Sequence, residues 1–216
     1  SVLEQFTQAA PPALLWPIRA TLYKSLFRAD LAFDRLGVHM PLFTKGADPG
    51  TWADGNGRAM PYRPNGVHAL TGPRYSLAQI NHYPLGAMDG FLVKMMRGKP
   101  NHADQPIDLA YWVDRNYGCH RDTTILRHQN AVTARISALK SDATLARLHS
   151  AGVAWRLDTI KTALTTLEGL NFYNRLLRLP PTRVLPIGQQ KERVAQLAEA
   201  RRLAQTRGTA HGDAGR

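Results

Sequence analysis

The chain has 216 residues and a mass of 24.0 kDa, which is enough for one sizeable hydrophobic core or two small ones. Its composition is ordinary for a globular protein, with 44% hydrophobic and 20% charged residues, and no apolar run approaches the roughly 20 residues that span a bilayer. The single cysteine, Cys119, excludes an internal disulfide, and residues 1–30 do not show the pattern of a signal peptide.

The formal net charge of +12 is distributed unevenly along the chain. Residues 1–120 hold 12 basic and 9 acidic side chains, whereas residues 121–216 hold 16 basic and 7 acidic ones. A basic second half could attract anionic lipid, nucleic acid or nucleotide sugars. It could equally be the solvated face of arginine-rich helices, because arginine is a good helix former.

The first 40 residues predict a connector, a short helix and a short strand. Residues 1–17 contain three prolines and are expected to be mostly extended, and residues 18–27 are expected to form a short helix. Lys24 and Arg28 are four residues apart and would share one side of it, either as a solvated pair or as a cationic clamp for phosphate. A strand over residues 36–40 would place His39 at its end, as a hydrogen-bonded core residue or as a site residue.

Residues 44–73 are rich in glycine and proline and predict a long loop. The apolar residues 74–83 then predict a strand, Pro84 and Gly86 a turn, and residues 87–97 an amphipathic helix that ends at Gly98. His82 would lie at the end of this strand, just before a helix N-terminus, where ligands and anions bind in α/β sheets. The simpler interpretation is a strand packed on a helix, with a histidine at the bend.

After residue 106 the pattern changes to repeated helical spacing. Helices are predicted over residues 108–116, from Asp122 or Thr123 to about Lys140, and from an Asp142 cap onward. Helical spacing continues over residues 159–177, prolines interrupt it at residues 180–186, and a final helix is expected over residues 189–207, with a disordered tail from residue 209.

The order and spacing of several short motifs resemble bacterial glycosyltransferases of family 2 type. The block that carries most of the resemblance consists of Asn81-His82-Tyr83-Pro84, Phe91, Lys94, Arg97-Gly98 and Asn101-His102. The flanking motifs are Phe6-Thr7, Ala9-Ala10-Pro11, Lys24-Ser25-Leu26-Phe27-Arg28, Gly37-Val38-His39-Met40-Pro41, Trp52, Gly55, Gly57, Met60-Pro61, Ile107-Asp108-Leu109, Tyr111-Trp112-Val113 and Arg115-Asn116. The similarity covers roughly residues 1–160.

The chain departs from the family pattern at three places. Gly86-Ala87 stand where the family usually has a basic and a polar residue, and Ala29 stands where it often has proline. The family also holds its metal with an Asp-x-Asp pair, and no two aspartates here are two apart. The resemblance therefore implies that the chain corresponds to the second half of such an enzyme.

The resemblance implies an α/β fold class, the incomplete C-terminal part of a Rossmann-like nucleotide-diphospho-sugar transferase (GT-A) fold, followed by a mainly helical extension. We expect the catalytic part over residues 1–105, the helical extension over 106–180, and a basic helical arm and tail over 181–216. This chain alone should be weakly active or inactive. The loop of residues 44–73 would lie near the acceptor.

The resemblance also implies functions for individual residues. It assigns His82 to a divalent metal, Mn²⁺ or Mg²⁺, in the full-length enzyme, since imidazole is a competent metal ligand. It assigns Lys24, Arg28, His39, Lys94 and Arg97 to the nucleotide-diphosphate sugar donor. The catalytic base, the sugar and the acceptor are not identified.

The acceptor implied by the family is a glycan or a lipid-linked molecule. This predicts a cytoplasmic protein with peripheral contact to the inner face of the membrane. The rival hypothesis is a non-enzymatic basic helical module that binds nucleic acid or an anionic membrane surface. Nucleic acid is the less expected partner, because no helix interleaves aromatic and basic residues as nucleic-acid binders do.

Overall fold

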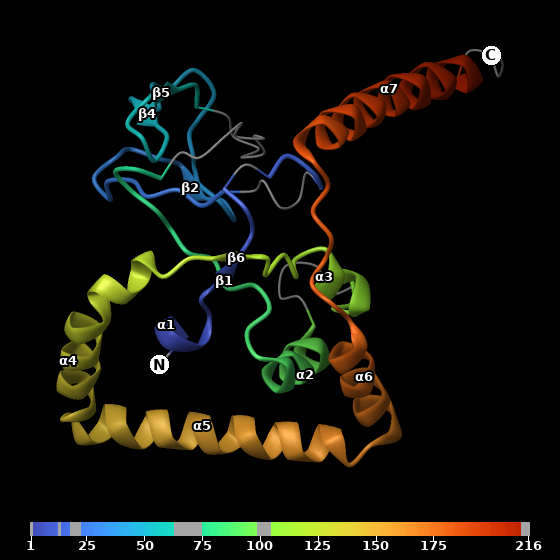
Figure 1. The fold of residues 1–216 in the computed structure, drawn as a ribbon. Coiled ribbons are helices and arrows are strands. Elements are labelled where there is room, and N and C mark those ends of the chain that lie inside the picture. Colours follow the sequence, from blue (N-terminus) through green and yellow to red (C-terminus); the bar gives the residue numbers. More distant parts are fainter. Residues whose placement is uncertain (1, 13, 18–22, 63–74, 99–104, 213–216) are drawn as a thin grey trace. The chain divides into compact units, whose positions relative to one another are not determined.

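The computed structural model describes residues 2–12, 14–17, 23–62, 75–98 and 105–212 (Figure 1). These residues form two compact units, and each unit is built from two separate stretches of the chain. Unit 1 contains Ser1–Ala10 and Tyr83–Arg183, and unit 2 contains Pro11–His82 and Val184–Arg216.

Unit 1 is mainly helical. Its short N-terminal stretch adds a turn of helix and one strand, and strand β1 pairs antiparallel with β6, with Gln8 opposite Arg121 and Ala9 opposite His120. The elements of unit 1 are α1 (Val2–Gln5), β1 (Gln8–Ala9), α2 (Met88–Arg97), α3 (Leu109–Val113), β6 (His120–Arg121), the 3₁₀-helix η2 (Thr124–His128), α4 (Gln129–Lys140), α5 (Ala143–Leu164) and α6 (Leu167–Arg178).

The core of unit 1 is centred on α2, which packs against α5 and α6. Phe91 and Leu92 of α2 are fully buried. The ring of Phe91 meets Trp112 edge-on at 4.9 Å between centroids and stacks on Phe172 at 6.1 Å. Ile107 and the fully buried Leu176 complete this cluster. Burying one such side chain contributes roughly 1.5–3 kcal/mol, so α2 is the element that holds the helices of unit 1 together.

Side-chain caps define where the helices of unit 1 begin. Asp108 accepts from the N–H of Tyr111 at the start of α3. Asp142 accepts from the N–H groups of Thr144 and Leu145 at 2.8 and 2.9 Å. At α6 the Thr166 hydroxyl accepts from the N–H of Gly169 at 3.0 Å. These caps satisfy N–H groups that have no partner inside the helix, which fixes each helix start.

Unit 2 has little regular structure apart from its last helix. It holds two antiparallel hairpins, with Arg35 opposite Leu42 in one and Trp52 opposite Met60 in the other. Its elements are β2 (Arg35–Leu36), β3 (Pro41–Leu42), β4 (Trp52–Ala53), β5 (Ala59–Met60) and α7 (Ile187–Gly212). The hairpins are joined by Tyr62, which donates from its hydroxyl to Pro41 O at 3.0 Å and contacts the Phe43 and Trp52 rings.

A buried glutamine connects the two stretches of unit 2. Gln190, in the first turn of α7, is only 3% exposed. Its Oε1 accepts from the N–H groups of Leu15 at 2.7 Å and Trp16 at 3.1 Å, and its Nε2 donates to Leu185 O at 2.6 Å. The neighbouring Leu14 and Leu15 are buried as well. One side chain therefore fastens the N-terminal segment to the start of α7.

The predictions for the second half of the chain are largely confirmed. The helix after Asp122 ends at Lys140, Asp142 caps α5, and residues 179–186 are irregular. The helix expected over residues 87–97 is α2, and Gly98 ends it with φ +72°. The expected disorder from residue 209 is wrong as far as Gly212, because α7 continues to that residue.

The strand predicted over residues 74–83 is wrong for the described residues 75–83, which form no ladder. Their backbone bonds go elsewhere: the N–H groups of Leu77 and Ala78 donate to Gly55 O, and Ser76 N donates to the Asn56 side chain. Leu77 and Ile80 are 75% and 52% exposed. The segment fastens the β4–β5 turn instead of burying its apolar side chains in a sheet.

Two further predictions in unit 2 are wrong. Residues 23–27, the described part of the expected helix over residues 18–27, are not helical. Of the strand expected over residues 36–40, only Leu36 lies in a strand, and residues 37–40 form the turn of the β2–β3 hairpin, so His39 lies in that turn. The turn closes through the Gly37 N–H, which donates to Met40 O at 2.9 Å.

The Rossmann-like fold class stays a prediction. In the described parts of the chain the strands form three separate two-stranded antiparallel ladders. The segments expected at 1–105, 106–180 and 181–216 also stay predictions. The compact units divide the chain after Ala10, His82 and Arg183.

Two helical glycines should respond oppositely to alanine. At Gly152 in α5, no atom lies within 4 Å of the position a Cβ would take, so Gly152→Ala should raise the free energy of unfolding by roughly 0.5–1 kcal/mol. At Gly169, a Cβ would collide with Ala163 O in the last turn of α5, so Gly169→Ala should lower the free energy of unfolding by roughly 1–3 kcal/mol. Urea unfolding followed by circular dichroism measures both changes. A change of the same sign in the two variants would contradict the close packing described at Gly169.

Replacing Gln190 should destabilise unit 2. Gln190→Leu would remove the acceptor from the N–H of the buried Leu15, which costs roughly 1–3 kcal/mol, and from the N–H of the half-buried Trp16, which costs less. Gln189→Leu is the matched control, because Gln189 is the exposed neighbour on the same helix. Thermal unfolding should show a lower midpoint for the first variant only, and equal midpoints would contradict the connection.

Candidate functional site

Two of the residues that the resemblance assigns to the donor, Lys24 and His39, come together in unit 2. The segment 23–25 runs along the turn of the β2–β3 hairpin. Ser25 donates to His39 O from its N–H at 3.1 Å and from its hydroxyl at 2.8 Å. Lys24 Nζ donates to Val38 O at 3.0 Å. We call this arrangement of residues 23–25 and 37–40 the Lys24–His39 junction.

The His39 ring is oriented by a backbone carbonyl. Nδ1 lies 2.9 Å from Tyr23 O. Because a carbonyl oxygen only accepts, Nδ1 carries the proton of this bond, and in the neutral ring Nε2 keeps its lone pair. The same Nδ1–carbonyl arrangement orients histidines whose Nε2 binds metals or exchanges protons. His39 is half-buried, so its ring is held but not enclosed.

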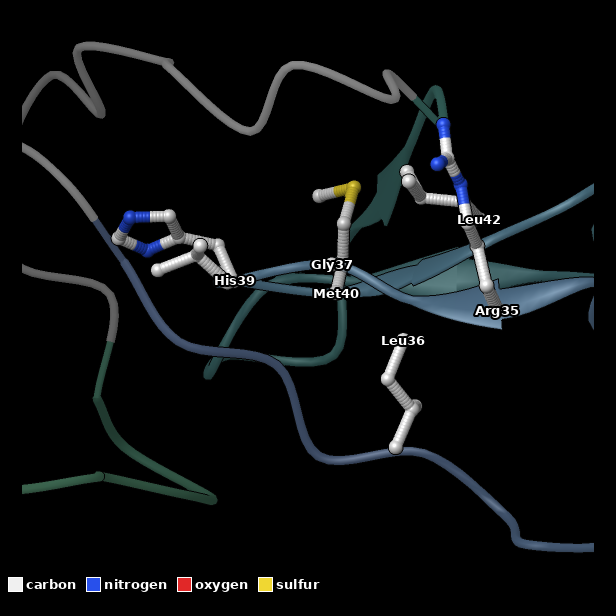
Figure 2. A pocket seen from close by; sticks show the side chains of 7 residues that line it. Arg35, Leu36, Gly37, His39, Met40 and Leu42 are labelled. Carbon is white, nitrogen blue, oxygen red and sulfur yellow. The ribbon is translucent and has the colours of Figure 1, made fainter. Parts of the chain in front are cut away.

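A hollow of about 420 Å³ adjoins the junction and is formed by the hairpin itself (Figure 2). Figure 2 shows the His39 ring at one end of this hairpin and the Arg35 guanidinium at the other. The lining is apolar between these two groups, from Leu36, Gly37, Val38, Met40 and Leu42. An imidazole and a guanidinium on an apolar floor suit a ligand that has an apolar face and anionic or hydroxyl groups.

Lys24 keeps donors for a ligand, whereas Arg28 is paired. An ammonium has three N–H donors, and one of those on Lys24 is used by Val38 O. Arg28 forms a bidentate pair with Asp30, with Nε donating to Oδ1 at 2.9 Å and NH2 contacting Oδ2. The clamp expected from a shared helix face is wrong, because residues 23–27 are not helical. Lys24 reaches the site through the hairpin contact instead.

Lys94 has structural partners in unit 1. Its Nζ donates to Pro84 O and, at 3.0 Å, to the Tyr111 hydroxyl, and it also lies over the Tyr111 ring. The Arg115 guanidinium covers the same ring at 3.7 Å from its centroid. Lys94 thus joins the turn before α2 to α3. Arg97, which was expected to act together with Lys94, lies about one turn further along α2. It is the last residue of that helix and is exposed.

His82 is exposed and lies in an irregular segment at the end of the first stretch of unit 2. The described residues contain no group of three or more histidine, cysteine, aspartate or glutamate side chains that could hold a metal ion. The assignment of His82 to Mn²⁺ or Mg²⁺ in the full-length enzyme stays a prediction. Lys94 and Arg97 belong to unit 1, so a common space for them and His82 stays a prediction.

Unit 1 contains two buried polar atoms, Trp112 Nε1 and Tyr117 OH, that have no hydrogen-bond partner among the described residues. Burial, and to a smaller extent the Asp114 carboxylate, raises the pKa of Tyr117 to about 12. Its phenol keeps its proton at neutral pH, so we assign it no role as a base.

Sequence reasoning missed Ser25, Tyr23 and Arg35. Tyr23 contributes through its backbone carbonyl, and Ser25 contributes through its N–H and its hydroxyl, and no spacing in the sequence indicates that these groups meet His39. Arg35 could have been found, because a basic residue beside a short apolar run before a Gly-Val-His turn is visible in the sequence. Comparison with protein-family models, with curated proteins and with solved structures finds no match for this chain.

The tautomer of His39 is a direct test of the junction. We expect a ¹H–¹⁵N spectrum of the neutral imidazoles to show His39 protonated at Nδ1, because Tyr23 O accepts that proton. His149, an exposed histidine of α5, is the reference for a ring without such a bond. A His39 signal with the proton on Nε2 would contradict the contact.

Proposed function

We propose that this chain is the C-terminal portion of a glycosyltransferase of family 2 type, which transfers a sugar from a nucleotide-diphosphate sugar to an acceptor in glycan or polysaccharide synthesis. One observation carries the proposal. Lys24 and His39, two residues that the motif resemblance assigns to the donor, converge from separate segments at one junction beside a hollow.

The chemistry needs cations and hydrogen-bond donors where the departing diphosphate gains negative charge. The remaining N–H donors of Lys24 would bind a phosphoryl oxygen, and Arg35 would approach from the other end of the hairpin. When the ring is neutral, Nε2 of His39 would accept a hydrogen bond from a hydroxyl group of the donor sugar, and when the ring is protonated it would donate one to a phosphoryl oxygen. The carbonyl of Tyr23 would keep the ring in place through both states.

No group of three or more histidine, cysteine, aspartate or glutamate side chains among the described residues could hold a metal ion. A Mn²⁺ or Mg²⁺ at His82 would require carboxylate ligands from outside these residues. Among the described residues, no helix combines the length and the hydropathy that crossing a bilayer requires. The proposal includes a cytoplasmic location with peripheral contact to the membrane. It also includes an acceptor that is a glycan or a lipid-linked molecule.

The second candidate is a basic helical module that binds an anionic surface without catalysis. The observation that favours it is the exposure of the helices in the second half of the chain, where almost every residue from 133 to 158 faces solvent. The two candidates differ in their use of the junction. A transferase requires a diphosphate to bind there, and a docking module does not.

Pyrophosphate and UDP should bind at the junction. In calorimetric titrations, Lys24→Gln and His39→Gln should each weaken binding roughly 10–100-fold, because each removes a charge-assisted hydrogen bond. Lys45→Gln is the matched control: it removes the same charge from an exposed lysine of unit 2 outside the junction. Binding that is equal in all three variants would overturn the proposal, as would retention on a nucleic-acid column but not on a UDP column.

A further inference from the structure

Helix α5 is exposed along most of its length. It packs on α2 and α6, and its buried residues, Ile160 and Ala163, lie in its last two turns (Figure 1). Over residues 143–158, every residue except Ala146 is exposed. Most helix stability in proteins comes from burying an apolar face, and this part of α5 leaves such a face open.

The open face carries uncharged residues at a regular spacing. From residue 145 to residue 162, steps of three and four residues alternate along one side of α5, which is the spacing with which two helices pack lengthwise against each other. The large side chains of this row, Leu145, Leu148 and Trp155, are 46%, 53% and 62% exposed. We call the row the Trp155 seam, and its six residues are Leu145, Leu148, Gly152, Trp155, Thr159 and Thr162.

The centre of the seam combines a large projecting side chain with a gap. Trp155 projects, whereas at Gly152 no atom lies within 4 Å of the position that a Cβ would take. A glycine inside a helix costs roughly 0.5–1 kcal/mol relative to alanine, and no close contact among the described residues requires it here. A large ring from a second helix can pack over such a glycine.

The seam itself carries no charged side chain. Helical spacing places Arg147 away from it, and Arg156 at its edge donates from Nη2 to Gly90 O of α2 at 3.1 Å. The Thr159 hydroxyl donates to Trp155 O at 2.8 Å, so its polar group has a partner within the helix and its methyl group can pack. An uncharged row of this kind suits another uncharged helix face better than a charged surface.

We propose that the Trp155 seam joins two copies of this chain through an antiparallel pair of α5 helices. The occupant is a second copy because the seam is complementary to itself. A two-fold axis between positions 153 and 154 places Trp155 of each copy over Gly152 of the other, and Leu148 of each copy opposite Thr159 of the other. Every large side chain then meets a small one, and each of these contacts occurs twice.

The length of the seam predicts a reversible dimer. Residues 145–162 extend over about 26 Å of helix, so a single pair of such helices forms an interface at the small end of the range for specific complexes. Trp155, of a residue type enriched among interface hot spots, lies next to the two-fold axis at the centre of the contact. The proposal does not rest on the proposed transferase function, since none of its residues belongs to the Lys24–His39 junction.

Analytical ultracentrifugation of the whole chain tests the proposal. We expect the mass to rise from monomer to dimer with protein concentration. Trp155→Ala should weaken the dimer at least about tenfold, because it removes the side chain at the centre of the contact. Gly152→Gln should weaken it at least about tenfold as well, because its side chain fills the gap that receives the ring, while glutamine is a good helix former that preserves α5.

Matched controls separate the seam from general hydrophobicity and from helix stability. Leu157→Ala removes a side chain that is 59% exposed on the same helix but on the side away from the seam. Gly188→Gln changes a glycine of α7 at which a Cβ would also meet no atom within 4 Å. Both controls should dimerise like the unaltered chain. A chain that stays monomeric at all concentrations, or equal losses in the seam and control variants, would overturn the proposal.

Thiol cross-linking tests the antiparallel direction independently of affinity. In a chain that carries Cys119→Ser, which removes the exposed cysteine, Leu148→Cys and Thr159→Cys are prepared as separate variants. A short bis-maleimide should link a mixture of the two variants and neither variant alone, since in the antiparallel pair identical positions are 11 residues, or about 17 Å, apart along the helix. Linking of Leu148→Cys to itself would indicate a parallel pair and overturn the proposal. A monomeric chain that binds vesicles through Trp155 would also overturn it and assign the face to a membrane.

Discussion

Buried backbone groups must be hydrogen-bonded, and in unit 2 few of them can be satisfied by helices or ladders. Gln190 shows how the chain meets this constraint, because its single amide satisfies two N–H groups of the N-terminal segment and one carbonyl before α7. Ser25 does the same for His39 O at the hairpin. Unit 2 is therefore held by specific side chains at a few points, and its candidate site exists because one of those points includes His39 and Lys24.

Unit 1 is held together by an apolar core between helices instead of by single polar side chains, which explains why its elements could be predicted. Its helices are indicated by periodic apolar residues and by capping residues such as Asp108 and Asp142. Both are local features of the sequence. Phe91 and Leu92 fall on the apolar face of α2, and this face is the one that is buried. Local pattern and tertiary packing agree there, so the boundaries at Gly98 and Lys140 agree as well.

In unit 2 the sequence pattern and the fold disagree, because contacts distant in sequence decide the outcome. Residues 75–83 have the composition of a strand, yet backbone N–H groups of this segment donate to Gly55 and Asn56. Residues 23–27 have helical spacing, yet Ser25 donates to the carbonyl of His39 in the hairpin turn. Lys24 and His39 were singled out by motif, but the expected reasons, a helix face and a strand end, are wrong. Their meeting depends on two carbonyl contacts that no spacing rule contains.

The internal use of each cation limits where this basic chain can bind an anion. A cation whose donors already serve the fold binds a ligand only by giving up those bonds, and this applies to Lys94 at Tyr111, Arg28 at Asp30 and Arg156 at Gly90. Lys24 differs, because one carbonyl positions it while two donors remain. Arg135, Lys140 and Arg147 differ in another way, since no ion pair among the described residues engages them. A single positioned lysine beside an oriented imidazole suits a small anionic ligand.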